Sequence, residues 1–300
     1  MNLKLYKREG KAALPEFELN PFLNNPERYV PSQPLVDAVN VAMMMGQPLL
    51  VTGEPGTGKT QLAYHLACFF DLGQPLVFNA QTSSTATDLF YKYDALGHFQ
   101  YNQNNSKQLA PEELEEKFIT YSALGEAIRR NRRTVVLIDE IDKAPRDLPN
   151  DILFAIEHLT FRVPEINRTF QADSESRPII IMTSNSEKNL PDAFMRRVVY
   201  FHIPFPTPDE LLYILTRKTD QMNVSDLRKV IEHFNKIREL KLKKLPSTAE
   251  LIYWTLLLHK LNFPIRKLDG PLSSEERLLL LTSYSVLAKN KEDLDLLKYL

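Results

Sequence analysis

The amino-acid sequence predicts an α/β fold, in which a five-stranded parallel sheet forms a three-layer sandwich with helices and an all-helical domain follows. Three observations lead to this prediction. Short apolar runs alternate with helix-like stretches as far as residue 203, a proline-rich segment comes next, and strand-like runs are absent beyond it. Strands that alternate with helices are typical of parallel crossovers.

The predicted strands are five short runs rich in apolar and β-branched residues, namely Leu49–Thr52, Leu76–Asn79, Val135–Ile138, Ile179–Thr183 and Val198–Ile203. They are continuously apolar, as expected for strands that are buried on both faces. Helix-like patterns lie between them, for example at Lys59–Phe70, Glu112–Arg130 and Asp147–Leu159. The sheet should therefore have helices on both faces.

A domain boundary is predicted at residues 204–208, where three of five residues are proline. Such a segment cannot form a central strand or a helix interior. Beyond it, amphipathic helix patterns cover Asp209–Lys218, Ser225–Leu240, Ser247–Leu261 and Ser273–Lys289. We expect an α/β domain over residues 1–206 and a helical domain over residues 207–300.

The composition is that of an ordinary globular protein, with 300 residues and a net charge of −1. This charge gives no global indication of a surface that binds nucleic acid or membrane. The single cysteine, Cys68, excludes an internal disulfide framework and fits a reducing compartment. No segment is long and apolar enough for a membrane span, and Met1–Gly10 lacks the apolar core of a signal peptide. We expect a soluble cytoplasmic protein.

The clearest motif is Gly53-Glu54-Pro55-Gly56-Thr57-Gly58-Lys59-Thr60, which matches the P-loop pattern G-x-x-x-x-G-K-[ST]. It directly follows a predicted strand and precedes a predicted helix. Glycines let backbone amides converge on phosphates, and the helix N-terminus adds its positive dipole end. We expect this segment to bind ATP, with Lys59 on the β- and γ-phosphates and the Thr60 hydroxyl on Mg²⁺.

Polar residues end the third and fourth predicted strands. Asp139 suits the second protein contact to Mg²⁺, and Glu140 suits a general base that polarises the attacking water. Paired acids after a strand can also cap the next helix. Asn185, which ends Thr183-Ser184-Asn185, can hold the attacking water or the γ-phosphate, and a simple Ser-Asn turn is the alternative.

These residues together resemble the AAA+ superfamily and, more narrowly, the MoxR-like ATPases. The similarity is densest in Pro48–Thr60, Asp88–Phe99, Val135–Pro145 and Pro178–Pro206. The resemblance implies the strand order 5-1-4-3-2, a helical lid, and assembly into a homo-oligomeric ring, usually a hexamer. It also implies that Asn185 is the sensor that follows the fourth strand.

The same resemblance implies further site residues. Arg196 and Arg197 lie where such proteins carry an arginine finger that reaches the neighbouring subunit's nucleotide; pairing with surface acids is the alternative. Phe161–Ala172 occupies the position of a β-hairpin that faces the pore or a partner in related rings; a plain edge hairpin is the alternative. Ala249 and Glu250 stand at the place of the second-sensor arginine of many lids. We hypothesise that lid closure around ATP is therefore weaker, or that a lid residue such as Arg217 replaces that arginine.

Two function classes are the main hypotheses, and a nucleotide-regulated assembly scaffold with negligible turnover is a third option. The resemblance favours a motor that remodels or matures a partner protein, of the von Willebrand factor A type by family analogy. The alternative is a nucleic-acid-directed ATPase of the restriction or clamp-loading type, supported by the basic run Arg129–Arg133 and opposed by the neutral net charge. The alternative is that the run only faces solvent, because it ends a predicted helix and the helix dipole favours cations there without any ligand.

Overall fold

The computed structural model describes residues 25–105, 109–186, 190–219 and 222–300, together with Glu9, Lys11 and Ala13. The chain forms two compact units. The α/β unit consists of Pro31–Gly53 and Lys59–Ile203, and the helical unit consists of Met1–Val30, Glu54–Gly58 and Pro204–Leu300. The division into domains 1–206 and 207–300 stays a prediction.

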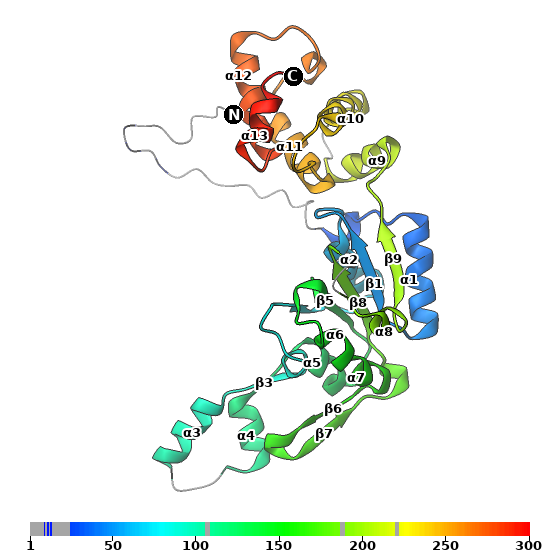
Figure 1. The fold of residues 1–300 in the computed structure, drawn as a ribbon, viewed down its shortest axis with the longest axis vertical. Coiled ribbons are helices and arrows are strands. Elements are labelled where there is room, and N and C mark those ends of the chain that lie inside the picture. Colours follow the sequence, from blue (N-terminus) through cyan, green and yellow to red (C-terminus); the bar gives the residue numbers. More distant parts are fainter. Residues whose placement is uncertain are drawn as a thin grey trace. The chain divides into compact units, whose positions relative to one another are not determined.

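The α/β unit is built on a five-stranded sheet with the order β2-β5-β8-β1-β9 (Figure 1). Every neighbouring pair in this sheet is parallel. The strands are β1 (Leu49–Gly53), β2 (Leu76–Asn79), β5 (Val135–Asp139), β8 (Ile179–Ser184) and β9 (Val199–Ile203). When the five are counted in chain order, the sheet is 5-1-4-3-2. The predicted fold class and strand order are confirmed.

Burial separates the central strands of this sheet from its edges. Strand β1 is buried at every residue, whereas the edge strands β2 and β9 alternate between half-buried and exposed residues. The helices of this unit are α1 (Gln33–Met45), α2 (Lys59–Phe69), α3 (Ala95–Asn104), α4 (Pro111–Phe118), α5 (Ala123–Arg130), α6 (Leu148–Asp151), α7 (Leu153–His158) and α8 (Asp192–Met195). The continuously apolar sequence of the central strands thus reflects burial on both faces.

The prediction of one helix over Glu112–Arg130 is wrong. Strand β4 (Ile119–Tyr121) separates α4 from α5 and pairs antiparallel with β3 (Tyr91–Tyr93). The α5 glycine, Gly125, lies so close to the backbone of Phe90 that a Cβ atom would come within 1.9 Å of its carbonyl oxygen. The pairing of Ile119–Tyr121 with β3 therefore overrides the helical pattern of the sequence.

The predicted hairpin over Phe161–Ala172 is confirmed as a structural element. Strands β6 (Thr160–Val163) and β7 (Arg168–Gln171) pair antiparallel. Phe161 stacks on Phe90 with ring centroids 5.2 Å apart, and Arg168 Nη1 lies 3.1 Å from Glu115 Oε2. Aromatic packing and an ion pair therefore join the hairpin to the segment between β2 and α5.

The helical unit contains α9 (Pro208–Lys218), α10 (Val224–Glu239), α11 (Thr248–Lys260), α12 (Ser274–Ser283) and α13 (Lys291–Leu297). Thr207, Ser247 and Ser273 begin three of these helices through capping boxes with the glutamate three residues on. The core contains the fully buried side chains of Trp254, Phe234 and Tyr284, among others. No helix in the described part of the chain is long and apolar enough to span a membrane.

Candidate nucleotide site

The P-loop segment connects β1 to α2, as its sequence predicts. Gly56 and Gly58 have φ angles of 76° and 90°, a region that residues with a side chain rarely adopt. The Thr57 hydroxyl donates to the Glu54 carbonyl oxygen at 2.8 Å. The loop therefore has the backbone that a phosphate cradle requires.

Lys59 begins α2 and is 7% exposed. Its ammonium group donates to the Gly53 carbonyl oxygen at 2.8 Å and to Asn185 Oδ1 at 2.9 Å. Burial lowers the pKa of Lys59, against the opposing effect of the nearby carboxylates of Asp139, Asp142 and Glu140. Lys59 is thus a buried cation that donates to two neutral oxygens, and such a cation is suited to a highly charged anionic ligand.

Thr60 and Asp139 supply a pair of hard oxygen ligands. The Thr60 hydroxyl donates to Asp139 Oδ1 at 3.0 Å and lies 3.3 Å from Oδ2. Magnesium is commonly held by one or two such protein oxygens, with water and substrate phosphates in its other positions. The donor set of Thr60 and Asp139 therefore fits Mg²⁺ bound together with a nucleotide.

Glu140 lies at the end of β5 in a left-handed conformation, with φ 55° and ψ 48°. Its backbone N–H donates to the Thr183 hydroxyl at 2.9 Å, and its Oε1 accepts from Asn185 Nδ2 at 3.3 Å. Its Oε2 forms a close ion pair with Lys143, and this bond raises the pKa of Lys143. The carboxylate is 40% exposed, so water can reach it.

The structure thus brings together the predicted residues Lys59, Thr60, Asp139, Glu140 and Asn185 at one edge of the sheet. This edge is formed by the carboxyl ends of β1, β5 and β8, where open α/β sheets bind their ligands. Sequence reasoning missed Thr183, Asp142 and Lys143. For Thr183, the available signal was its place in the polar segment Thr183-Ser184-Asn185 at the end of the fourth apolar run.

Arg196 and Arg197 follow α8 and are both exposed. Arg197 Nε lies 3.5 Å from Glu157 Oε1. Among the residues that the structure describes, the Arg196 side chain makes no hydrogen bond or ion pair. Within that part of the structure, neither arginine forms a hydrogen bond or ion pair with the predicted nucleotide residues of its own chain.

Within the helical unit, the start of α11 lies against the segment Glu54–Gly58. The backbone N–H of Ala249 donates to the Gly56 carbonyl oxygen at 3.2 Å. Arg217 instead donates to the Glu27 carbonyl oxygen at 2.9 Å. Arg238 of the same unit lies with Nη2 3.4 Å from Glu54 Oε2.

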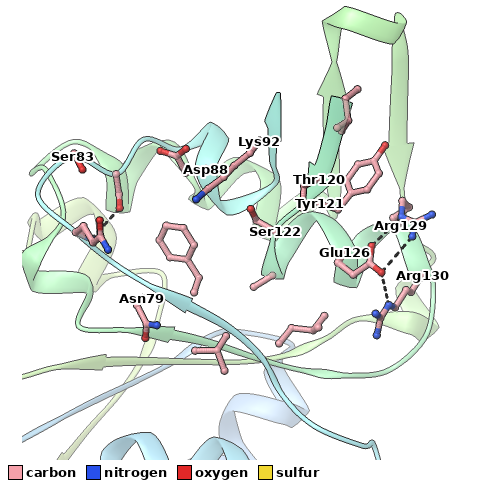
Figure 2. A pocket seen from close by; sticks show the side chains of 17 residues that line it. Asn79, Ser83, Asp88, Lys92, Thr120, Tyr121, Ser122, Glu126, Arg129 and Arg130 are labelled. Atoms are coloured by element: carbon pink, nitrogen blue, oxygen red, sulfur yellow. Dashed lines mark hydrogen bonds and ion pairs between the residues drawn. The ribbon is translucent and has the colours of Figure 1, made fainter. Parts of the chain in front are cut away.

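The basic run Arg129–Arg133 borders a cavity of about 880 Å³ between β2, β4 and α5. Figure 2 shows Arg129 and Arg130 both reaching Glu126, with Nε–Oε distances of 3.0 and 2.7 Å. Arg133 donates to the Glu175 carbonyl oxygen at 3.0 Å. Much of the positive charge of this run is therefore directed at groups of the same chain.

Comparison with known proteins places the α/β unit in a family. A family model described as the AAA domain of the dynein-related subfamily matches residues 48–198. The chain belongs to this AAA domain family. The prediction of the AAA+ superfamily is confirmed at this level, while its MoxR-like branch stays a prediction. A search of curated proteins found no match.

Solved structures similar to this AAA domain protein include RuvB of Thermotoga maritima, described as a Holliday junction branch migration motor. That structure is 17% identical, covers 87% of this chain and 70% of its own, and gives a TM-score of 0.49. A lysine-to-arginine mutant of the same protein is 16% identical, covers 83% and 73%, and gives 0.48. At this distance the likeness carries no argument about function.

Proposed function

We propose that the chain is a MoxR-like AAA+ ATPase that hydrolyses Mg-ATP in an oligomeric ring and uses the motion to remodel or mature a partner protein. One observation carries the proposal. The P-loop ammonium of Lys59 and the carboxylate of Glu140 bind the same side chain, Asn185, at 2.9 and 3.3 Å. A phosphate-binding cation and a general base are thus connected through a sensor amide.

Each residue has a role in this proposal. Residues 53–60 bind the triphosphate through backbone amides and Lys59, while Thr60 and Asp139 hold Mg²⁺. The magnesium ion, when bound, neutralises charge that develops on the phosphate oxygens. Glu140 accepts a proton from the attacking water, and Asn185 orients Glu140 relative to Lys59.

Glu140 must release one of its contacts for this chemistry. Its Oε2 is paired with Lys143, whose side chain is 52% exposed and therefore free to move into solvent. An exposed ion pair of this kind contributes little to stability, so breaking it to reach the active arrangement costs little free energy. The Asn185 contact can meanwhile keep Glu140 directed towards Lys59.

The ring model rests on Arg196 and Arg197. An arginine finger acts on the nucleotide of a neighbouring subunit, so it must be exposed on its own chain and lie away from its own site. Both arginines are exposed, and Arg197 is partly engaged by Glu157. We therefore propose Arg196 as the finger and Arg197 as the residue that positions the segment after α8. Residues 1–206 would form the nucleotide-binding domain and residues 207–300 the lid.

A protein partner is favoured over nucleic acid because two arginines of the basic run are ion-paired within the chain. Arg129 and Arg130 share Glu126, and this pairing leaves less net charge for phosphate contacts. A partner of the von Willebrand factor A type and a cytoplasmic location are proposed from the MoxR-like resemblance. Stimulation of ATP hydrolysis by DNA or RNA, with a steep salt dependence, would favour the nucleic-acid alternative instead.

The ring proposal is tested by measuring specific ATPase activity against protein concentration for wild type, Arg196→Ala and Arg197→Ala. Wild-type activity should rise with concentration as the shared sites form. Arg196→Ala should lose roughly 10³-fold or more in rate, the range known for arginine fingers, and Arg197→Ala should lose less. A rate that is independent of concentration and unaffected by either change would rule out the shared site.

A further inference from the structure

We propose that Thr183 is a positioning residue whose single hydroxyl sets both acidic residues of the nucleotide site. The inference rests on the proposed Mg-ATPase function and adds a residue that the P-loop and sensor motifs do not contain. Thr183 lies on β8, is 1% exposed, and contacts both Asp139 and Glu140.

The position of Thr183 follows from the register of the sheet. Strands β5 and β8 are parallel, with Ile138 paired to Met182, so Thr183 comes level with Asp139. Asn185 is the first residue after β8, and the side chains of Thr183 and Asn185 donate to Asp139 and Glu140, respectively.

The Thr183 hydroxyl uses its donor and an acceptor position at the same time. It donates to Asp139 Oδ1 at 2.5 Å and accepts from the Glu140 backbone N–H at 2.9 Å. A hydroxyl has only one proton, so the direction of both bonds is fixed by its partners. The carboxylate and the amide thus hold the hydroxyl in one orientation, and the hydroxyl holds both of them.

Each of these two bonds has a separate consequence for the site. The bond to Asp139 Oδ1 reaches the same oxygen that accepts from Thr60, so it fixes the carboxylate that would ligate Mg²⁺. The bond from Glu140 N–H stabilises a left-handed backbone, a conformation that is unfavourable for a residue with a side chain. That backbone determines where the Glu140 carboxylate extends.

A second bond supports the same turn. The backbone N–H of Asn185 donates to Asp142 Oδ1 at 3.3 Å. The end of β8 therefore holds the turn after β5 at two successive levels, through the Thr183 side chain and the Asn185 backbone. Removing the Thr183 hydroxyl should leave the turn attached but Asp139 and Glu140 less well oriented.

The test uses three substitutions at this position. Thr183→Ser retains the hydroxyl, and Thr183→Cys offers a weak hydrogen-bonding group of similar size. Thr183→Val retains the shape of the side chain but cannot form hydrogen bonds. Thr255→Val is the matched control, because Thr255 is fully buried and its hydroxyl donates to its own helix at Leu251. For each variant, the affinity for a fluorescent ATP analogue is measured with excess Mg²⁺ and with EDTA, along with kcat and the unfolding temperature.

We expect Thr183→Ser to resemble wild type. Thr183→Val should lose the Mg²⁺-dependent part of the affinity and about 10–100-fold in kcat, the usual effect of removing a group that orients a metal ligand. Affinity in EDTA should be unchanged, and Thr183→Cys should fall between the two. Thr255→Val should retain both the Mg²⁺ response and kcat.

Two results would overturn the inference. The first is that Thr183→Ser and Thr183→Cys have equal Mg²⁺ dependence, equal kcat and equal unfolding temperatures. This result would show that the Thr183 hydroxyl only fills a buried position and does not orient the acidic residues. This comparison holds even if Thr183→Val does not fold. The second is that wild type neither binds nor hydrolyses Mg-ATP, in which case the proposed function fails and the inference fails with it. If wild type is active and the Thr183 variants do not differ in Mg²⁺ dependence or kcat, only the role of Thr183 is refuted.

Discussion

Lys59 Nζ donates a hydrogen bond to Asn185 Oδ1 at 2.9 Å, so the P-loop cation is held by the residue that directly follows β8. The other end of the same amide donates to Glu140 Oε1 at 3.3 Å. Asn185 therefore has different partners for its oxygen and its nitrogen. Neither an aspartate nor an alanine can serve both partners, because a carboxylate cannot donate and a methyl group does neither.

Asn185→Ala should therefore separate catalysis from binding. We expect ATP affinity within about threefold of wild type, because the Lys59 charge remains, and kcat reduced by roughly 10²-fold, because the base is misplaced. Isothermal titration and steady-state phosphate release measure the two quantities. Asn150→Ala, at an exposed asparagine of the same unit, is the control. A loss of affinity with unchanged kcat would show that Asn185 only supports nucleotide binding.

Glu140→Gln should bind ATP and fail to hydrolyse it. The amide keeps the shape of the side chain but cannot accept a proton, and the loss of a general base commonly costs 10²–10⁴-fold. We also expect this variant to accumulate in the assembled form with ATP, as measured by size-exclusion chromatography with light scattering. Glu175→Gln, an exposed residue of the same unit, should behave like wild type. Normal turnover in Glu140→Gln would remove Glu140 from its proposed role.

Arg238 should contribute to the stability of the helical unit. Its guanidinium lies 3.5 Å from the centroid of the Phe205 ring, donates to the Pro246 carbonyl oxygen and faces Glu54. Arg238→Ala should lower the free energy of unfolding by about 2 kcal/mol, the range for hydrogen bonds to charged groups. Lysine lacks the planar group that stacks on a ring, so Arg238→Lys should restore little of this loss.

Urea unfolding followed by fluorescence measures this effect, because Trp254 is the only tryptophan and is fully buried in the helical unit. Arg228→Ala, at an exposed arginine on the same helix α10, is the matched control. Equal midpoints for the Arg238 and Arg228 variants would show that the Phe205, Pro246 and Glu54 contacts contribute nothing measurable.

His233 should make the helical unit less stable at mildly acidic pH. Its Nδ1 lies 2.9 Å from Asp269 Oδ1 and its Nε2 lies 2.7 Å from the Tyr284 hydroxyl. Burial lowers the pKa of His233, although Asp269 acts in the opposite direction. A lowered pKa means that the folded state binds the proton less well than the unfolded state. Stability is therefore fully present above about pH 6.5, the ordinary value, and is lost as the pH falls below it.

The loss should not exceed about 1.4 kcal/mol per pH unit, the effect of one proton. Urea midpoints measured by Trp254 fluorescence between neutral and mildly acidic pH would show it. His233→Phe should be less stable at neutral pH but lose this pH dependence, while His259→Gln, an exposed residue, should keep it. An identical pH profile for wild type and His233→Phe would exclude His233 as the source.

Features of the fold that depend on a local sequence pattern could be predicted from the sequence. The central strands are buried on both faces and so are continuously apolar, and the P-loop depends on consecutive residues. Strand β4 could not be predicted, because Ile119–Tyr121 is too short for a period and lies between two helices. It forms through pairing with Tyr91–Tyr93, a distant contact that no local pattern encodes.

The same distinction applies to the candidate site. Asp139 and Glu140 could be selected because they end an apolar strand. Thr183 could not, since a threonine in a strand is ordinary and its importance depends on the β5–β8 register. Arg217 and Arg238 lie on helices with similar charge patterns, and only the packing of the helical unit shows that Arg238, rather than Arg217, faces Glu54.

The most direct test of the account is a comparison of ATP binding and phosphate release by wild type and Lys59→Ala. Wild type should bind Mg-ATP and release phosphate. Lys59→Ala should lose most of the affinity and nearly all turnover, because the triphosphate loses its principal cationic partner, while its unfolding temperature stays near that of wild type. Unchanged ATP affinity in a folded Lys59→Ala variant would contradict the assignment of residues 53–60 as the nucleotide site.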